Sequence, residues 1–310
     1  MRYVAGIDGG QSSTTAVIVD ESGAVVGRGT AGPADHVDEG PGSSRCADAC
    51  AAAFASALAS AGLSPQTRVE AAVAGISGYD DAFDGAVPAL AAGRFRFVHD
   101  LPIALAGAVP TRPAVLLLSG TGSAAYGEDE AGVGVRTGGW GYLFGDEGSA
   151  FAIARDALAA AMRADDRGER SALTQPALEF FGCADVRALA SAALRGRISR
   201  ARLASFAPRV HDAAAAGDAD GLRIIADAAD ALASLAALTI ARLDRAGSAV
   251  GVALAGGSFA NPAFAALVGT RLHAHAPNAQ VLRPRYAAAI GAALLAFDDA
   301  GLTRPADVTG

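Results

Sequence analysis

The stretch Gly6-Ile7-Asp8-Gly9-Gly10-Gln11-Ser12-Ser13-Thr14-Thr15-Ala16-Val17-Ile18-Val19-Asp20 decides the fold. It predicts a strand that ends in a carboxylate, a tight turn of small and hydroxyl residues, and a second, alternating strand. Glycine lets backbone N–H groups approach an anion, and hydroxyl groups add further donors. The pattern therefore predicts a phosphate-binding turn made of Gly9, Gly10, Gln11, Ser12, Ser13 and Thr14, with Asp8 placed to hold a magnesium ion.

A related turn recurs in Ser119-Gly120-Thr121-Gly122-Ser123. Both copies show the order strand, turn, strand, acidic glycine turn and third strand, and such a repeat predicts two similar halves. We expect two facing hairpins, one from each half, to grip a nucleotide, with Gly120, Thr121 and Gly122 as the second phosphate loop. The alternative is a pair of ordinary glycine-containing hairpins.

Length and composition indicate a two-domain protein of the reducing cytoplasm. A chain of 310 residues exceeds the usual size of one core, and 52% apolar residues suffice to fill two. We place the domains at residues 1–112 and 113–285, with a helix in 286–310 packing back on the first. The N-terminus lacks the pattern of an export signal, and three cysteines cannot complete a disulfide framework.

The same figures argue against two classes of partner. Net charge is −7, and no block of Lys or Arg could follow a phosphate backbone, so nucleic acid is not expected. The longest uncharged run, residues 246–270, is interrupted by glycines and a proline, so no membrane span is expected. Cys46 and Cys50 share a helix face that a metal could use, but Cys183 is distant, and buried apolar cysteines are the simpler interpretation.

The order of predicted elements is typical of an α/β protein. The first half reads strands at 3–8, 14–20, 25–31, 69–75 and 95–98, with helices at 45–61, 81–91 and 101–108. The second half begins with three strands from residue 114 and then becomes helical, with further strands at 249–255 and 280–282. Its expected helices cover 150–163, 173–180, 184–195, 200–216, 221–246, 262–275 and 287–299.

Three further segments carry residue types suited to chemistry. Asp100 follows a strand, where α/β sheets place ligands, and it is the candidate base, although an Asp there also reads as a helix N-cap. The glycine-rich run 138–149 sets Asp146 and Glu147 beside Trp140, which suits a sugar, or else it is a plain turn in which Ser149 caps a helix and Trp140 is a core residue. Gly256-Gly257-Ser258 could receive adenine and ribose, or be an ordinary turn from strand to helix.

Taken in order, these motifs resemble those of the N-acetylglucosamine kinases and of the related ATPases that activate benzoyl-CoA reductase, within the actin-like sugar kinase superfamily. The run GGWG through GDEGS at 138–149 is the most specific part of the match. The resemblance implies two actin-like, ribonuclease H-like α/β domains, with mixed sheets flanked by helices and the active site in the cleft between them. It also implies transfer of the γ-phosphoryl group of ATP to the 6-hydroxyl of an amino sugar, with Mg²⁺, in a homodimer.

By the same resemblance, Asp100 is the catalytic base and Asp8 the magnesium-associated carboxylate. The nucleotide contacts fall on the two phosphate turns and on Gly256, Gly257 and Ser258. The sugar contacts fall on Asp35, Ser77, Gly78, Asp100, Gly139, Trp140 and Asp146.

One departure from the family pattern concerns substrate choice. Asp35 stands where many relatives have Asn, and its negative charge could favour the free amine of glucosamine over an N-acetyl group. Another hexosamine, or ATP hydrolysis of the activator type, is a further alternative. The activators hold an iron–sulfur cluster through cysteines, and three scattered cysteines argue against that role.

Overall fold

A computed structural model of the protein describes residues 1–34, 42–79, 83–245 and 247–310. The chain forms two compact units. Unit 1 consists of Met1–Thr111 together with Pro284–Gly310, and unit 2 consists of Arg112–Arg283. Both chain termini therefore belong to unit 1.

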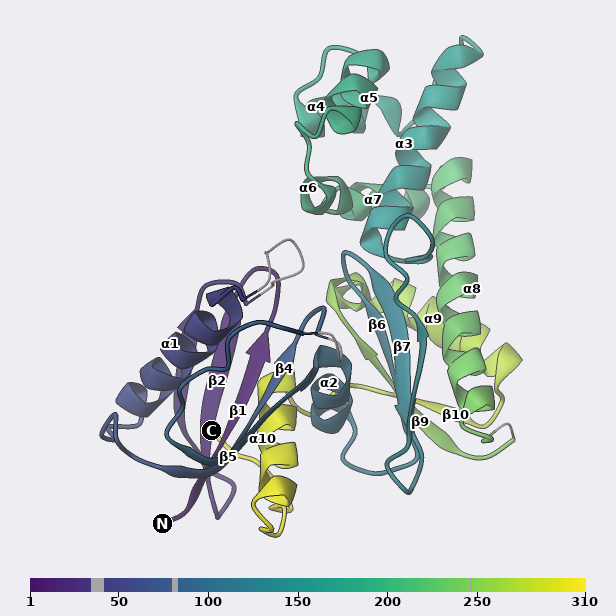
Figure 1. The fold of residues 1–310 in the computed structure, drawn as a ribbon. Coiled ribbons are helices and arrows are strands. Elements are labelled where there is room, and N and C mark those ends of the chain that lie inside the picture. Colours follow the sequence, from purple (N-terminus) through teal and green to yellow (C-terminus); the bar gives the residue numbers. More distant parts are fainter. Residues whose placement is uncertain (35–41, 80–82, 246) are drawn as a thin grey trace. The chain divides into compact units, whose positions relative to one another are not determined.

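A five-stranded sheet forms the centre of unit 1 (Figure 1). The strands lie in the order β3-β2-β1-β4-β5: β1 (Tyr3–Gly9), β2 (Thr14–Asp20), β3 (Val25–Ala31), β4 (Val69–Ile76) and β5 (Ala92–His99). The first three pair antiparallel, whereas β1 with β4 and β4 with β5 pair in parallel. Side chains alternate between the faces, so that β1 sends Ile7 into one core and Val4 into the other.

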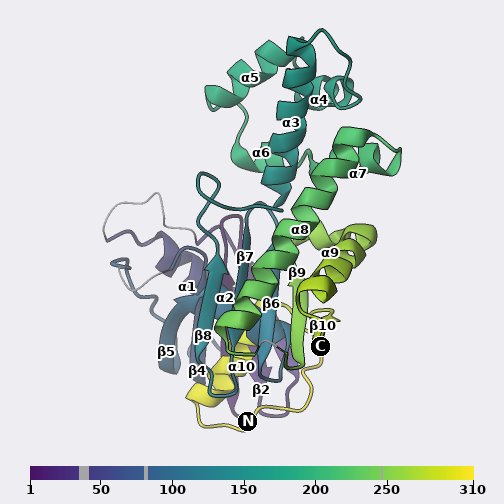
Figure 2. The same ribbon diagram turned by 90° about the vertical axis from the view of Figure 1, so that its right-hand side faces the viewer.

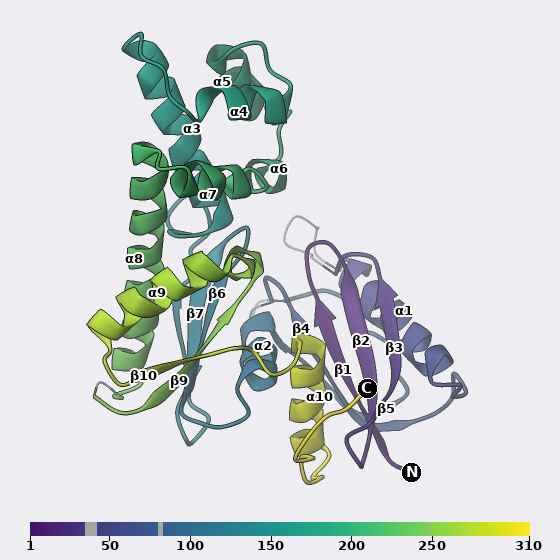
Figure 3. The same ribbon diagram turned by 180° about the vertical axis from the view of Figure 1, so that it is seen from behind.

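Helices cover both faces of this sheet. One face packs against α1 (Arg45–Ser60). The other packs against α2 (Asp100–Ala108) and α10 (Ala288–Asp299), which Figure 3 draws in yellow beside the strands. Gly29 lies directly against α1 and Gly6 against α10, and a Cβ on either glycine would overlap backbone atoms of the helix. The two glycines thus set how closely the helices approach the sheet.

Unit 2 repeats the same sheet arrangement. Its strands lie in the order β10-β9-β6-β7-β8: β6 (Ala114–Ser119), β7 (Ser123–Glu128), β8 (Gly134–Gly138), β9 (Val250–Ala255) and β10 (Ala279–Leu282). As in unit 1, β6 pairs antiparallel with β7 and β7 with β8, whereas β6 with β9 and β9 with β10 pair in parallel. The repeat predicted from the two turns is therefore confirmed.

The helices of unit 2 form one core with the sheet. Long α8 (Ala219–Arg242) packs on β6, β7 and β8 and runs beside α9 (Pro262–His275) (Figure 2). The other helices lie beyond the end of the sheet at which β6 ends: α3 (Ala150–Asp166), α4 (Thr174–Phe181), α5 (Val186–Leu194), α6 (Arg200–Ala204) and α7 (Ala207–Ala215). A short 3-10 turn, η1 (Gly257–Ala260), follows β9.

Helix α8 is long and apolar enough to cross a membrane by length and composition, and it is the one such helix in the described chain. Its apolar residues, among them Ile224, Leu232 and Ile240, are buried in the core of unit 2. Packing inside a globular unit therefore accounts for its composition.

Two predicted helices are wrong. Residues 83–91, the described part of the helix expected at 81–91, contain no helix; there Phe83 packs against Tyr79 and Phe97 instead. The single helix expected at 200–216 is broken into α6 and α7 at Ser205 and Phe206. The break precedes Pro208, which has no N–H to continue a helix but fits the first turn of a new one.

Candidate active site

The parallel strands of unit 1 bring three of the predicted site residues to one sheet edge. Asp8 is in register with Gly75, and Ile76 is in register with His99. The residues that follow β4 and β5, Ser77 and Asp100, therefore lie at the same carboxyl edge as Asp8. Gly78 comes next, with a positive φ of 78° that suits glycine.

The turn between β1 and β2 is held closed by backbone hydrogen bonds. Gly10 N–H donates to Ser13 O at 3.0 Å, and Ser77 N–H donates to Gly9 O at 2.9 Å. A Cβ on Gly9 would lie 2.6 Å from Ile76 Cδ1 and 2.8 Å from Ala34 Cβ, so these side chains would have to shift to admit one. The turn therefore packs tightly against the end of β4.

Of the turn's side chains, those of Gln11, Ser12 and Ser13 are exposed and can reach a ligand. Thr14 is different, because it is fully buried and its hydroxyl donates to Gly32 O at 2.8 Å. Its side chain therefore ties the turn to the end of β3 rather than facing solvent.

Asp8 and Asp100 are electrostatically coupled. Burial, and then the negative charge of Asp100, raise the pKa of Asp8 to about 6. Two nearby carboxylates of this kind suit a divalent cation, which in nucleotide sites is held by one or two carboxylates and the phosphates. No group of three or more His, Cys, Asp or Glu side chains in the described ranges could form a cation cage without such phosphates.

His99 is a neighbour of Asp100 that sequence reasoning did not single out. Its Nδ1 lies 2.7 Å from Asp100 Oδ1 and 3.2 Å from the backbone N of Leu101. One ring nitrogen cannot donate and accept at once, so the two contacts belong to different protonation states. In the capping arrangement of α2, the backbone N–H of Leu101 donates to Nδ1, whereas a ring that carries a proton on Nδ1 would donate to Asp100 Oδ1. His99 is the N-cap residue of α2, so the alternative reading of Asp100 as the N-cap is wrong.

The second turn, between β6 and β7, is fixed to the segment that precedes α3. Ser119 Oγ donates to Gly148 O at 3.0 Å, and Ser123 Oγ donates to Glu147 O at 2.8 Å. In return, Ala150 N–H donates to Gly120 O at 2.8 Å. Ser149 caps α3, as expected, by accepting from Ala152 N–H.

Asp146 lies beneath this turn and is only 5% exposed. Its Oδ1 accepts from Ser123 N–H at 3.0 Å, and its Oδ2 accepts from Arg200 Nη2 at 2.6 Å. Its φ of 63° lies in the left-handed region, which Asp tolerates better than most residues. Sequence reasoning missed Arg200, because nothing local marks an arginine 54 positions away as a partner of Asp146.

The Gly256–Ser258 loop, which follows β9, lies against the turn between β6 and β7. Gly256 has a φ of 101°, and a Cβ there would overlap the backbone of Ser119. The hydroxyl of Ser258 is buried and has no hydrogen-bond partner within the described chain. A buried hydroxyl without a partner costs stability, so it suits a site that a ligand completes. Gly257 is exposed beside it.

The segment after β8 carries the remaining predicted sugar contacts. Gly139 N–H donates to Ser123 O at 3.1 Å, which joins this segment to the same turn. Trp140 is 74% exposed, so the alternative reading of Trp140 as a core residue is wrong. Asp35 lies outside the described residues.

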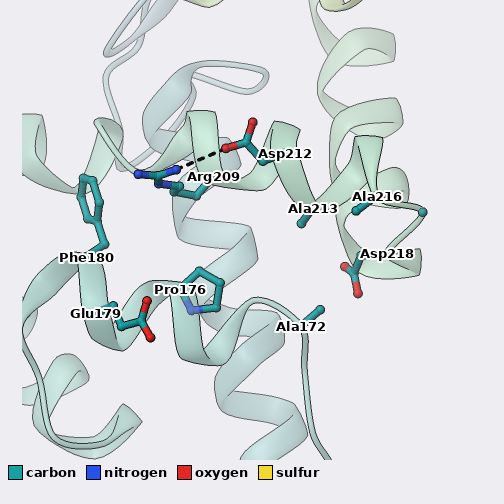
Figure 4. Close-up of a pocket in the computed structure, with 10 residues that line it drawn as sticks. Ala172, Pro176, Glu179, Phe180, Arg209, Asp212, Ala213, Ala216 and Asp218 are labelled. Atoms are coloured by element: carbon teal, nitrogen blue, oxygen red, sulfur yellow. Dashed lines mark hydrogen bonds and ion pairs between the residues drawn. The ribbon is translucent and has the colours of Figure 1, made fainter.

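A pocket of about 820 Å³ lies elsewhere in unit 2, among α4, α7 and the turn before α8 (Figure 4). Pro176 and Phe180 give it an apolar wall, and Arg209 and Asp212 on one edge pair with each other. Asp218 is occupied in capping α8. None of the predicted site residues lines this pocket, and the chemistry described above does not use it.

Two of the three cysteines lie in the core of unit 1. Cys46 and Cys50 are buried in α1 within the core of unit 1, and the hydrogen bond with Cys46, together with burial, raises the pKa of Cys50. Cys183 belongs to unit 2. The interpretation as apolar core thiols fits both helix cysteines.

Comparison with known proteins identifies relatives along nearly the whole chain. Residues 5–296 match the BadF/BadG/BcrA/BcrD ATPase family. The N-acetyl-D-glucosamine kinase of Dictyostelium discoideum is 28% identical over 309 residues, covering 94% of this chain and 97% of that protein. The N-acetylmuramic acid/N-acetylglucosamine kinase of Clostridium acetobutylicum is 36% identical over 138 residues, which span 44% of this chain and 45% of that one.

Solved structures show the same fold. A Chromobacterium violaceum protein proposed to be an N-acetylglucosamine kinase is 26% identical, with a TM-score of 0.74 over 95% of this chain and 99% of that one. The ROK hexokinase of Thermus thermophilus matches with a TM-score of 0.60 at 18% identity, covering 96% of this chain and 99% of that one. The predicted fold, two mixed sheets with flanking helices as in the actin-like sugar kinases, is confirmed.

Proposed function

Because the chain belongs to the BadF/BadG/BcrA/BcrD ATPase family, we propose that it is an ATP-dependent kinase that phosphorylates the 6-hydroxyl of N-acetylglucosamine. The observation that carries the proposal is the edge of unit 1, where the coupled carboxylates Asp8 and Asp100 lie beside an exposed turn of Gln11, Ser12 and Ser13. This edge combines the two requirements of phosphoryl transfer, namely a phosphate-binding turn and a base.

In the proposed reaction, Asp100 accepts the proton of the sugar 6-hydroxyl as that oxygen bonds to the γ-phosphorus, while the bond from phosphorus to the bridging oxygen of ATP breaks. His99, whose Nδ1 lies 2.7 Å from Asp100 Oδ1, keeps the Asp100 carboxylate in one orientation. Asp8 would hold Mg²⁺, which neutralises phosphate charge when it is bound. The second turn and the Gly256–Ser258 loop of unit 2 would supply backbone donors to the nucleotide, and Ser258 would gain the partner that it lacks.

The choice of N-acetylglucosamine rests on the names of the two curated relatives. Glucosamine remains the alternative that Asp35 raises. The structure lends no support to an activator-type ATPase, which would need cysteines placed to hold an iron–sulfur cluster, because the two cysteines of unit 1 are buried in one helix. A cytoplasmic location and a homodimer remain predictions.

A coupled assay of ADP release tests the proposal. ATP turnover should depend on added N-acetylglucosamine and should be slower with glucose, glucosamine, N-acetylmuramate and N-acetylmannosamine. The 6-deoxy analogue of N-acetylglucosamine should bind without supporting turnover, because it lacks the acceptor oxygen. A rate of ATP turnover that no amino sugar changes would exclude the proposed amino-sugar kinase activity. Phosphorylation of the 6-deoxy analogue would exclude the 6-hydroxyl as the acceptor.

A further inference from the structure

Arg200 joins three parts of unit 2 that the sequence keeps apart. Its guanidinium donates to Asp146, lies 5.1 Å from the ring centre of Tyr142 and 5.6 Å from that of Phe151. It comes from α6, which lies next to the end of the sheet that carries the turn between β6 and β7 (Figure 2). A Cβ on Gly122 would lie 2.8 Å from Asp146 Oδ1 and 3.1 Å from Arg200 Nη2, so the ion pair directly supports that turn.

The Arg200–Asp146 ion pair serves to fix the positions of side chains more than to stabilise the fold. Asp146 is 5% exposed, and the Arg200 side chain is 33% exposed, so forming the pair removes two charges from much of their water. Arg200 Nε is also buried with no acceptor among the residues that the structure describes. An ion pair that leaves a buried donor without an acceptor contributes less to stability, whereas it still fixes the positions of the groups that it contacts.

We propose that Arg200 is a positioning residue for phosphoryl transfer. It fixes Asp146, which holds Ser123 N–H and so the Gly120–Gly122 turn, and it fixes Tyr142 in the segment that also carries Gly139 and Trp140. One guanidinium thereby ties the proposed nucleotide turn to the proposed sugar segment. The functional part of this inference rests on the proposed kinase activity, whereas the structural part does not.

Three Arg200 variants test the inference, with Arg202 as the matched control on the same helix. Arg202 stacks on Phe180 and donates to its carbonyl oxygen, whereas the three contacts of Arg200 are with Asp146, Tyr142 and Phe151. Arg200→Gln should lower kcat/KM by about 10- to 100-fold, since a small misplacement of reacting groups has effects of that size. Arg200→Lys keeps the charge but loses the planar fork, so it should fall between Gln and wild type. Arg202→Gln should retain wild-type kcat/KM.

Chemical rescue separates positioning from a general loss of folding. Millimolar guanidinium should restore part of the activity of Arg200→Ala and none of that of Asp146→Ala, because only the first variant leaves a space of the right shape beside an intact carboxylate. If kcat/KM of Arg200→Gln equals that of wild type, the inference is wrong. It is equally wrong if activity falls but neither lysine nor guanidinium restores any of it.

Hydrogen exchange gives a readout that does not depend on the reaction. The amide of Ser123 should exchange faster in Arg200→Gln than in wild type, and at the wild-type rate in Arg202→Gln. If the wild-type protein fails to phosphorylate amino sugars, the kinase proposal fails while this measurement still tests the link from Arg200 to the turn. Unchanged exchange at Ser123 in Arg200→Gln would remove that link even in an active kinase.

Discussion

At the residue scale, Asp100 is held by its chain neighbour. Asp100 Oδ1 lies 2.7 Å from His99 Nδ1, so the carboxylate is held beside the ring and its other oxygen keeps lone pairs free for a substrate hydroxyl. Asp100→Asn preserves size and can still accept through its amide oxygen, but it cannot take up a proton. Asp100→Asn is therefore the substitution that most directly tests the proposed role of Asp100 as the base.

We expect Asp100→Asn to reduce kcat by about 10²- to 10⁴-fold, the usual contribution of a positioned base. Nucleotide affinity, measured by titration with a fluorescent ADP analogue, should change little because the turn at Gly9–Ser13 is untouched. An Asn variant with the turnover of wild type would show that Asp100 is not the base.

Asp8 links the site to stability. Its pKa of about 6 in the folded protein lies above the ordinary 3.8, so between these values the folded state binds more protons than the unfolded state. The contribution of Asp8 to the free energy of unfolding therefore falls as the pH rises from about 4 to 6. Above that range the loss of stability has reached its full size. Asp8→Asn should consequently stabilise the metal-free protein at pH 7, by about 1–3 kcal/mol, and hardly at all at pH 4.

Urea unfolding of wild type and Asp8→Asn across this pH range provides the measurement. The two stability curves should converge on the acid side and separate toward neutral pH. Parallel curves would mean that the carboxyl is not destabilised by burial and by Asp100.

At the element scale, the close packing of helices on the unit 1 sheet depends on glycines, which have no side chain. Gly29→Ala should destabilise unit 1 by about 1–3 kcal/mol, because the added Cβ overlaps the backbone of α1 at Ala53 and the helix must move. Gly32→Ala is the matched control, since no atom of the residues that the structure describes lies within 4 Å of its Cβ position. Equal thermal midpoints for both variants would contradict a close contact between β3 and α1.

The elements that sequence predicted well are those with local signals. The capping residues Ser149 and Asn261 mark the starts of α3 and α9, and hydrophobic alternation with flanking glycines marks β1 and β2. The failures have non-local causes. Phe83 lies in an aromatic cluster with Phe97 of β5 instead of in a helix. The Arg200–Asp146 pair depends on packing between the turn before α3 and helix α6.

The candidate site follows the same division. Asp8, Ser77 and Asp100 could be placed at one edge of the unit 1 sheet from sequence because parallel strands align their carboxyl ends. That Thr14 is buried against Gly32, or that His99 rather than Asp100 is the N-cap of α2, depends on side-chain geometry that the pattern does not specify.

At the scale of the whole molecule, unit 1 is made from both ends of the chain and unit 2 from one continuous stretch. Helix α10 supplies Ala289, Ala293 and Phe297 to the core on one face of the unit 1 sheet, where they cover Val4, Val17 and Val73. The chain end adds a further tie, because Val25 N–H donates to Thr309 O at 2.8 Å. Without the last 27 residues, Pro284–Gly310, one face of that sheet would lose its cover.

A chain that ends at Arg283 should therefore fail to fold unit 1, since few domains have stability to spare for half a core. Unit 2 has its own continuous core and should keep its unfolding transition in the truncated chain. Calorimetry and amide exchange resolved by segment can follow both units, and adding residues 284–310 as a separate peptide should restore protection of β1 and β4. If the truncated chain protects these strands without the peptide, α10 is not required for the sheet that carries Asp8, and the position of the proposed base and metal carboxylates must be maintained by α1 and α2 alone.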